Sequence, residues 1–364
     1  MEPMTAAPRV LVAMSGGVDS AVAAALLHGQ GYDVIGVTMR LYTERDSTAL
    51  RSQRTCCGIE DVADARSTAQ RIGIPHYILN LEREFTTDVI DRFASEYAAG
   101  RTPNPCLACN QHVKFATLLD RAVAMGCDLL ATGHYARIER DEVGHHLLAA
   151  TDPAKDQSYV LYTLNQQALA RTLFPLGAIT KTETRRIATS LGLPVADKPD
   201  SADICFVPGG DYRTLLRERG VEFAPGAIVD AQGATVGTHE GAAGYTVGQR
   251  RGIGVSTGER RYVTAIDATT NVITLGDEEE LFTREVEASD PHWILAAPSI
   301  DEPLTARIRY HAVPIPARVT TVDANGFRLT SERRMRAASP GQALVLYRGD
   351  EVVGGGTIER ASNP

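Results

Sequence analysis

The fold of this chain is decided by one stretch, Arg9-Val10-Leu11-Val12-Ala13-Met14-Ser15-Gly16-Gly17-Val18-Asp19-Ser20. Its apolar first half is typical of a buried parallel strand, and the alanine-rich run at 21–27 predicts a helix. The two adjacent glycines between them allow positive φ angles and a close approach of a ligand to the backbone. The unpaired N–H groups at the start of the helix, together with its dipole, favour an anion. The stretch therefore predicts a phosphate cradle, to which Ser15 and Ser20 can add hydroxyl donors.

This glycine turn departs from two common phosphate-binding motifs. No lysine follows the glycines, as in G-x-x-x-x-G-K-S/T, and they are adjacent rather than spaced as in G-x-G-x-x-G. A plain tight turn would also fit two glycines, but the flanking Ser-Gly-Gly-x-Asp-Ser favours a binding loop. The sequence resembles the pyrophosphate loop of ATP pyrophosphatases, which split ATP between its α and β phosphates and use AMP to activate a carbonyl oxygen.

Length and composition fit an ordinary globular protein with two or three domains. The chain has 364 residues, of which 43% are hydrophobic and 23% are charged. No stretch approaches about 18 uncharged apolar residues, and the N-terminus lacks the layout of a signal peptide. We therefore expect a cytoplasmic protein with no membrane partner. The six cysteines of such a chain are more often catalytic, metal-binding or buried than paired in a disulfide framework.

The net charge of −8 is unevenly distributed along the chain. Residues 303–348 carry eight arginines against Asp323 and Glu332, a local balance of +6. Because salt limits charge interactions to about 10 Å, a local basic surface can bind phosphates even on an acidic protein. The C-terminal third is therefore a candidate nucleic-acid surface, although a solvated face would have the same composition.

Strand and helix patterns alternate up to a strand predicted at 127–131. This βαβα order predicts a doubly wound parallel sheet, whose ligands bind at the carboxyl ends of the strands. From residue 225 onward, glycine-rich sequence with short alternating runs predicts small antiparallel barrels or sandwiches. A loop over the site is expected at 41–57, and helices are expected at 60–72, 85–99, 112–125, 158–169, 181–191 and 211–219.

Two cysteine segments are unusual. In Thr102-Pro103-Asn104-Pro105-Cys106-Leu107-Ala108-Cys109-Asn110, the helix predicted to follow would place its positive end near Cys109 and favour a thiolate nucleophile. The C-x-x-C spacing also fits half of a zinc site, but the other cysteine pair, Cys56-Cys57, is adjacent. In Asp200-Ser201-Ala202-Asp203-Ile204-Cys205-Phe206 a lone cysteine lies at an apolar boundary and by itself fits a buried core thiol.

These segments belong to a series of ordered motifs. From near residue 9 to near residue 358 the chain resembles the tRNA-specific 2-thiouridylases. Besides the glycine turn and the two cysteine segments, the resemblance rests on Ala131-Thr132-Gly133-His134-Tyr135-Ala136-Arg137, Lys155-Asp156-Gln157-Ser158-Tyr159 and Gly248-Gln249-Arg250-Arg251-Gly252-Ile253-Gly254. Six motifs in one order are hard to obtain by chance.

The resemblance implies an α/β fold followed by two β-rich domains. Residues 1–207 would form an ATP-pyrophosphatase domain of the adenine nucleotide alpha hydrolase type, with a helical tRNA-contacting part at about 140–207. A small, mostly-β central domain would span 208–282. A C-terminal antiparallel β-barrel that binds tRNA would span 283–364.

The resemblance also implies a tRNA sulfurtransferase, a transferase of sulfur-containing groups. ATP would adenylate the C2 oxygen of the wobble uridine, and persulfide sulfur would replace that oxygen, giving 2-thiouridine, AMP and pyrophosphate. Mg²⁺ would accompany ATP, and Asp19 is a candidate for holding it. The expected partners are tRNAs with Lys, Glu or Gln anticodons, a cysteine desulfurase or sulfur-relay carrier as sulfur donor, and a reductant.

Roles carry over motif by motif. Cys109 corresponds to the nucleophile and Cys205 to the persulfide-bearing cysteine, and their disulfide would be cleared by the reductant. Some relatives have an aspartate, a candidate proton-transfer group, where this chain has Cys106. No metal ligand set is expected. ATP is expected at Ala13, Met14, Ser15, Gly16, Gly17, Val18, Asp19, Ser20, Met39 and Gly133. The target base and the tRNA are expected at Asn104, Pro105, Cys106, His134, Lys155, Asp156, Gln157, Arg309, Tyr310 and Gln342.

Three other functions fit part of the pattern. Another ATP pyrophosphatase, such as an amide- or argininosuccinate-forming ligase, needs neither the cysteine segments nor a tRNA-binding barrel. An iron–sulfur cluster on Cys106, Cys109 and Cys205 could hold the transferred sulfur in place of a persulfide. A non-enzymatic RNA-binding or nucleotide-sensing module predicts that serine at Cys109 and Cys205 leaves function intact.

Overall fold

The computed structural model describes residues 7–41, 59–200, 204–207, 211–255 and 258–362. The loop predicted at 41–57 lies outside these residues except for Leu41, as do Cys56 and Cys57. The chain forms two compact units: unit 1 is Met1–Asp88 with Cys106–Gly210, and unit 2 is Val89–Pro105 with Asp211–Pro364. Unit 2 therefore includes a stretch from the first third of the sequence. The domain boundaries derived from the resemblance stay a prediction.

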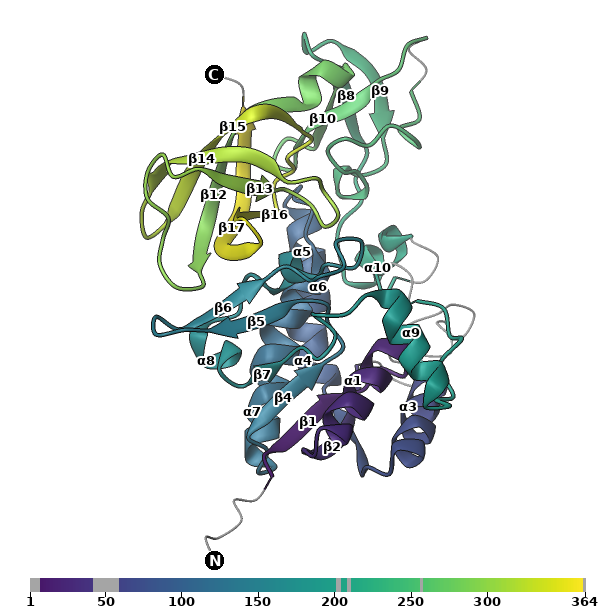
Figure 1. The fold of residues 1–364 in the computed structure, drawn as a ribbon. Coiled ribbons are helices and arrows are strands. Elements are labelled where there is room, and N and C mark those ends of the chain that lie inside the picture. The colour runs from purple at the N-terminus through teal and green to yellow at the C-terminus, as the bar shows by residue number, and fades with distance from the viewer. Residues whose placement is uncertain (1–6, 42–58, 201–203, 208–210, 256–257, 363–364) are drawn as a thin grey trace, which may run out of the picture. The chain divides into compact units, whose positions relative to one another are not determined.

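Unit 1 contains a five-stranded parallel sheet with the strand order β3-β2-β1-β4-β7 (Figure 1). The central strand β1 pairs on one side with β2, where Val12 lies opposite Gly36, and on the other with β4, where Val12 lies opposite Ala131. The predicted doubly wound sheet is thus confirmed, and the carboxyl end of β1 is its topological switch point. The strands are β1 (Arg9–Ala13), β2 (Asp33–Arg40), β3 (His76–Asn80), β4 (Leu129–Thr132) and β7 (Thr172–Leu173).

Helix α1 (Val18–Gly29) links the sheet to the helices around it. Ala24 and Leu27 of α1 pack with Val10 of β1 and with Ala65 of α3 (Ile59–Ile72) in one apolar cluster. Other α1 residues, among them Val22, pack against α9 (Lys181–Ser190) in a second cluster. Helix α1 is therefore packed on two faces. Unit 1 also contains α4 (Glu82–Phe85), the hairpin β5 (Arg137–Arg140) and β6 (His145–Leu148), η3 (Ser158–Leu161) and α8 (Gln166–Leu169).

Two predicted helices differ in the structure. The run 158–169 is a 3-10 turn, η3, followed by the short α8, because Asn165 between them caps α8 by accepting the Ala168 N–H at 2.8 Å. The helix expected at 112–125 starts earlier, at α6 (Pro105–Ala108), continues as the π-helical η2 (Cys109–Thr117) and ends with α7 (Leu118–Ala124). Pro105 suits the first helical position, where no N–H is needed.

The smaller β structure of unit 2 is a four-stranded sheet with the order β10-β11-β8-β9. Its strands pair antiparallel except β11 and β8, which are parallel, so the antiparallel prediction fails at this one pair. Ile228, Val263 and Ile273 are completely buried in its core. The strands are β8 (Gly226–Asp230), β9 (Thr235–His239), β10 (Tyr262–Asp267) and β11 (Val272–Gly276).

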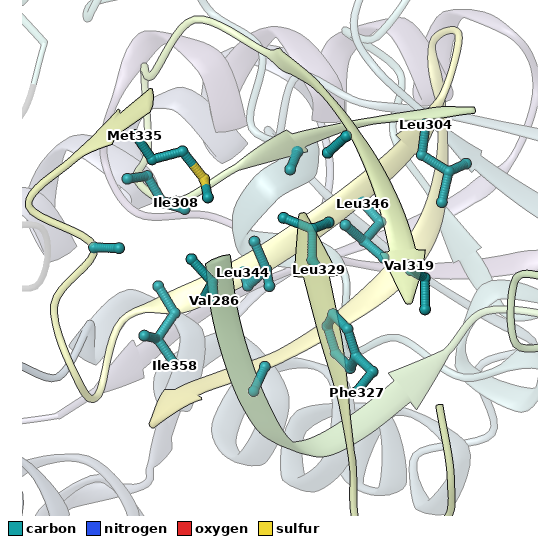
Figure 2. Packing of buried hydrophobic residues seen from close by; sticks show 14 of the residues in the cluster. Val286, Leu304, Ile308, Val319, Phe327, Leu329, Met335, Leu344, Leu346 and Ile358 are labelled. Carbon is teal, nitrogen blue, oxygen red and sulfur yellow. The ribbon is translucent and has the colours of Figure 1, made fainter. Parts of the chain in front are cut away.

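The larger β structure of unit 2 is a closed antiparallel barrel with the order β12-β15-β14-β13-β16-β17, in which β12 pairs with β17. Closure leaves no sheet edge unpaired, and alternate residues of each strand fill the interior. Figure 2 shows Leu329, Leu344 and Leu346 among these interior side chains. The predicted C-terminal barrel is confirmed. Its strands are β12 (Phe282–Trp293), β13 (Leu304–Arg307), β14 (Ile315–Val322), β15 (Gly326–Arg336), β16 (Ala343–Arg348) and β17 (Glu351–Ser362).

Short helices complete the described chain. A π-helical turn, η1 (Thr86–Asp91), continues α4 into α5 (Arg92–Ala98), so that the helix expected at 85–99 starts three residues earlier. The others are α10 (Tyr212–Glu218), η5 (Ala242–Gly244) and η6 (Glu278–Leu281). None of the helices in the described ranges has the length and hydropathy needed to cross a bilayer.

Candidate active site

The predicted phosphate loop lies where β1 ends and α1 begins, at the switch point of the sheet. Gly16 has a φ of 74°, and a Cβ atom there would lie 2.3 Å from the carbonyl oxygen of Asp61. Both the backbone conformation and the lack of space require glycine at this position. Gly17 is the N-cap of α1 and has a φ of −95°, so the expectation of positive φ holds for Gly16 alone.

The serines of the loop stabilise its shape from inside. Ser20 Oγ accepts the backbone N–H of Ser15 at 3.1 Å and donates to the carbonyl of Gly17 at 3.1 Å. Ser20 is buried, whereas Ser15 is half-buried. Of the two predicted hydroxyl donors, Ser20 therefore already donates within the loop.

The residues predicted to flank the adenosine lie on the strands beside β1. Gly133 follows β4, and a Cβ atom on it would lie 2.7 Å from the backbone nitrogen of Ser20 and 2.8 Å from the carbonyl carbon of Asp19. The end of β4 therefore packs directly on the first turn of α1. Met39 is buried near the carboxyl end of β2. Their contact with ATP stays a prediction.

Two lysines from late in unit 1 reach this loop, and the sequence interpretation missed both. Lys198 Nζ donates to the Gly16 carbonyl at 3.0 Å and to carboxylates of Asp61 and Asp64 at 2.6 Å each. Burial opposes the charge of Lys198, but these two carboxylates outweigh it and raise its pKa above the usual value. Lys181 Nζ lies 2.7 Å from both carboxylate oxygens of Asp19. The loop thus acquires lysines from 162 and 182 residues away rather than from the motif itself.

Asp19 has a second donor besides Lys181. The hydroxyl of Tyr135 lies 2.9 Å from Asp19 Oδ1 and 2.9 Å from Thr184 Oγ1. Burial, together with the negative charge of Asp19, raises the pKa of Tyr135. A metal ion on Asp19 would have to displace the Lys181 ammonium, so this arrangement does not fit a protein-held Mg²⁺. In the described ranges, no three His, Cys, Asp or Glu side chains lie close enough together to hold a metal ion.

Cys106 and Cys109 lie in the first turns of the helical run that begins at Pro105. The expected helix start near Cys109 is therefore wrong, because Pro105 begins the helix, and the positive helix end lies nearer Cys106. Cys106 is exposed and Cys109 is buried. A π-helical segment, a feature frequent at functional sites, starts at Cys109. The next residue, Asn110, anchors it by donating to the Val160 carbonyl at 2.9 Å.

Cys205 lies in a short turn, residues 204–207, and is half-buried. The Val207 N–H donates to the Ile204 carbonyl at 3.1 Å, and the buried Phe206 packs edge-on against Phe85 with ring centres 5.7 Å apart. Phe206, not Cys205, is the apolar anchor of this turn. The interpretation of Cys205 as a buried core thiol therefore fails, whereas Cys127 is such a thiol, with a pKa raised by burial.

Four of the predicted tRNA contacts have structural bonds inside unit 1: His134, Lys155, which binds Asp200 at 2.8 Å, Asp156 and Gln157. His134 Nδ1 lies 2.7 Å from Thr132 Oγ1, and burial, aided by the charge of Lys114, lowers the pKa of His134 well below its usual value. Asp156 is buried and accepts the backbone N–H groups of Ala150 and Ser158 at 3.0 and 3.1 Å. Gln157 Oε1 accepts the Tyr135 N–H at 2.9 Å. Their contacts with tRNA stay predictions.

The predicted tRNA contacts in unit 2 are more varied. Arg309 is exposed and donates to the Arg336 carbonyl, while Tyr310 is half-buried against His311, with ring centres 3.9 Å apart. Both follow β13, in the arginine-rich part of the chain. This placement is compatible with a phosphate-binding surface, and the contact itself stays a prediction.

Gln342 holds a segment of unit 2 to the barrel. Its Nε2 donates to the Thr102 carbonyl at 2.7 Å, and the Thr102 N–H donates to the Pro340 carbonyl at 2.8 Å. Asn104, two residues after Thr102, is half-buried, and the next residue, Pro105, is buried. Gln342 therefore fixes the approach to the segment predicted to meet the target base.

Comparison with known proteins finds similar proteins over nearly the whole length of the chain. Family models match residues 8–209, 214–277 and 283–358; they are described as "tRNA methyl transferase HUP domain", "tRNA methyl transferase PRC-barrel domain" and "Aminomethyltransferase beta-barrel domain". The chain is 48% identical to "tRNA-specific 2-thiouridylase MnmA" of Geobacter metallireducens, over 97% of both chains. It is 49% identical to the protein of the same name from Chloroflexus aurantiacus, over 96% of this chain and 98% of that one.

Similarity to solved structures is much weaker. A 4-thiouridine synthetase in complex with RNA and ATP matches with a TM-score of 0.34 and 17% identity, covering 58% of this chain and 53% of that one. This level of similarity supports no conclusion. The full-length relatives, by contrast, span both units and all of the motifs described above.

Proposed function

This chain belongs to the family of tRNA-specific 2-thiouridylases, and we propose how its own residues bring about the ATP-dependent thiolation of tRNA that this membership gives it. The observation that carries the proposal is the placement in one unit of the Gly16 loop, Cys109 and Cys205. The loop lies at the switch point of the parallel sheet, where α/β folds bind nucleotides. The cysteines supply the thiols that transfer of sulfur requires.

The first half-reaction activates the base. The C2 oxygen of the target uridine attacks the α phosphate of ATP, pyrophosphate leaves, and the uridine carries AMP on that oxygen. Backbone N–H groups at the start of α1 bind phosphate oxygens, and Ser15 adds a hydroxyl. Lys181 and Lys198 place positive charge beside the loop, where a phosphate in transfer gains negative charge. Mg²⁺ bound to ATP would neutralise part of the charge of its phosphates.

The second half-reaction delivers sulfur. The outer sulfur of a Cys205 persulfide attacks C2, and AMP leaves with the former oxygen. The Cys109 thiolate then attacks the inner sulfur, which frees 2-thiouridine and forms a Cys109–Cys205 disulfide. Alternatively, Cys109 first releases hydrosulfide, which attacks C2 itself. Both orders end in the same disulfide, so a two-electron reductant must restore the thiols.

The partners follow from this chemistry. A cysteine desulfurase or a sulfur-relay carrier loads Cys205, and the arginine-rich barrel with Arg309 and Tyr310 binds tRNA phosphates. We expect tRNAs with Lys, Glu or Gln anticodons and a cytoplasmic location. The target base has to leave the anticodon stack to reach the loop.

The decisive experiment is mass spectrometry of tRNA nucleosides after incubation with ATP, a sulfur donor and unmodified tRNA. We expect 2-thiouridine, together with AMP in equal amount, and none from the variants Cys109→Ser and Cys205→Ser. The family models carry the words methyl transferase, so a methylated uridine is the competing product. A methylated product, or 2-thiouridine from both serine variants, would contradict the proposal.

An iron–sulfur cluster on Cys106, Cys109 and Cys205 is the alternative route for the same product. Protein purified under anaerobic conditions distinguishes the two. Persulfide chemistry predicts a colourless, iron-free protein that is active, whereas a cluster absorbs visible light and activity follows the iron content.

A further inference from the structure

One carboxylate in unit 1 collects three cations. Asp200 lies 2.8 Å from Lys155 Nζ, 2.9 Å from Lys181 Nζ and 2.8 Å from the Arg185 guanidinium. Lys181 holds Asp19 of the phosphate loop at the same time, at 2.7 Å. Lys155, Lys181 and Arg185 thus share the carboxylates of Asp200 and Asp19.

Helix α9 provides the framework of the cluster. Thr180 caps its start by accepting the Glu183 N–H at 3.2 Å, and Lys181 occupies the first turn with a side chain that is only 11% exposed. Arg185 is one turn further along and therefore lies on the same face. Besides Asp200, its guanidinium donates to the carbonyls of Ala196 and Lys198 at 3.0 and 3.1 Å. The chain from 196 to 200 is thus fixed to α9.

Asp200 is charged at every pH at which the protein would be assayed. Burial opposes its charge, but the bonds from Lys155 and Lys181 outweigh this and lower its pKa to about 2. The ion pairs therefore persist through the working range of the enzyme. The strength of each pair is modest because the side chains are partly exposed, so the role of the cluster is geometric rather than a large gain in stability.

The position of Asp200 in the sequence relates the cluster to Cys205. Asp200 precedes Cys205 by five residues, and Phe206, immediately after the cysteine, is packed on Phe85. The chain is therefore anchored at Asp200 before the cysteine and at Phe206 after it. Lys181 binds both Asp200 and Asp19 and so joins Asp200 to the loop. Lys155, which also binds Asp200, belongs to the run predicted to contact tRNA.

We infer that Asp200 is a positioning residue for sulfur transfer: it holds the Cys205 segment in register with the phosphate loop by binding Lys181. This inference rests on the proposed function. Adenylation needs only the loop, the nucleotide and the base, whereas the second half-reaction also needs the persulfide within bonding reach of C2. A misplacement of about 1 Å can lower the rate of such a step by about a hundredfold. Loss of Asp200 should therefore separate the two half-reactions.

The test is the variant Asp200→Asn in the full chain, which keeps the size of the side chain and removes its charge. Pyrophosphate, the product of the first half-reaction, and 2-thiouridine are measured in the same reaction with unmodified tRNA, ATP and a sulfur donor. We expect pyrophosphate formation within about threefold of the unaltered enzyme, and at least about tenfold less 2-thiouridine per pyrophosphate. Asp200→Glu, which restores the charge, should recover this ratio to about a third of that of the unaltered enzyme.

The matched control is Glu183→Gln on α9, the helix whose Lys181 and Arg185 bind Asp200. Glu183 pairs with the exposed Arg186 at 2.6 Å and touches neither the loop nor the Cys205 segment through that pair. The control loses the same charge and should leave both pyrophosphate formation and the ratio unchanged. A general effect of charge on α9 would change both variants alike and would overturn the inference.

Other outcomes are equally decisive. If Asp200→Asn lowers pyrophosphate and 2-thiouridine in parallel, together with the melting temperature, Asp200 is only structural. If the ratio of 2-thiouridine to pyrophosphate stays at that of the unaltered enzyme, the inference also fails. If the asparagine variant does not fold, the ratio for Asp200→Glu decides, since a displaced carboxylate should lower it about threefold. If the unaltered enzyme yields no 2-thiouridine, the proposed function itself is wrong.

Discussion

Replacing Gly16 with alanine tests the geometry of the phosphate loop. The new Cβ atom would lie 2.3 Å from the Asp61 carbonyl oxygen and 2.8 Å from the Asp61 carbonyl carbon, both backbone atoms that cannot rotate away. The φ of 74° adds a conformational penalty of about 1–2 kcal/mol for a residue with a Cβ. Backbone shifts that relieve such overlap cost typically about 1–3 kcal/mol. We therefore expect Gly16→Ala to lower the free energy of unfolding by about 2–5 kcal/mol.

The control lies one residue away. A Cβ atom on Gly17 would meet Ser15 Oγ at 3.5 Å, an ordinary contact, and the φ of Gly17 is −95°. Gly17→Ala should therefore cost about 1 kcal/mol or less, the usual effect of alanine at an N-cap. Both glycines belong to the same sequence motif. A difference in stability between the two variants therefore reports the backbone conformation and the space for a Cβ atom at each position.

Two measurements check this pair of variants. Urea denaturation followed by circular dichroism gives the free energies of unfolding, and initial rates of AMP formation at varied ATP give KM. Gly16→Ala should raise the KM for ATP because the loop must move away from Asp61. Equal losses of stability in the two variants, or an unaffected Gly16→Ala protein, would refute the reasoning.

Two further predictions concern unit 2. Arg101 binds both carboxylate oxygens of Glu359, at 2.5 and 2.9 Å, so Arg101→Ala should destabilise the protein by about 1 kcal/mol at pH 7. Arg101 lowers the pKa of Glu359, so the pair contributes stability above the unfolded pKa of about 4.3 and loses it as the pH falls through the lower folded value. Urea titrations at pH 7 and pH 3 should therefore show a smaller effect in acid, and an equal effect would contradict this account. Leu344 is completely buried in the barrel, so Leu344→Ala should cost about 2–5 kcal/mol by the same titration, and a loss below 1 kcal/mol would argue against a close-packed barrel interior.

The local elements of unit 1 could be predicted because their signals are contiguous. The apolar run of β1 and the strand at 76–80 occur where their composition indicated, and the helix predicted at 181–191 is α9 within one residue. Strands and helices of this kind depend on side chains a few residues apart, which the sequence displays directly. The same locality explains why the loop at 13–20 could be identified.

Helix boundaries near the cysteines were less predictable. The polar run after Cys109 favoured a later helix start, but the helix begins at Pro105, because proline suits the first helical position. The run at 158–169 has helical composition, yet Asn165 caps a new short helix in its middle. In both cases one residue with a strong local preference, Pro105 or Asn165, set the boundary rather than the composition of the run.

The sequence by itself determined the order of strands and helices, the glycine loop and the identity of the two predicted catalytic cysteines. Tertiary structure alone decided that Lys181 pairs with Asp19, that Asp200 joins Lys155 and Lys181, and that Gln342 binds the Thr102 carbonyl. These partners are 19 to 240 residues apart, so no period or motif connects them. A charged side chain specifies only that some opposite charge is favourable, and the fold selects which one lies within reach.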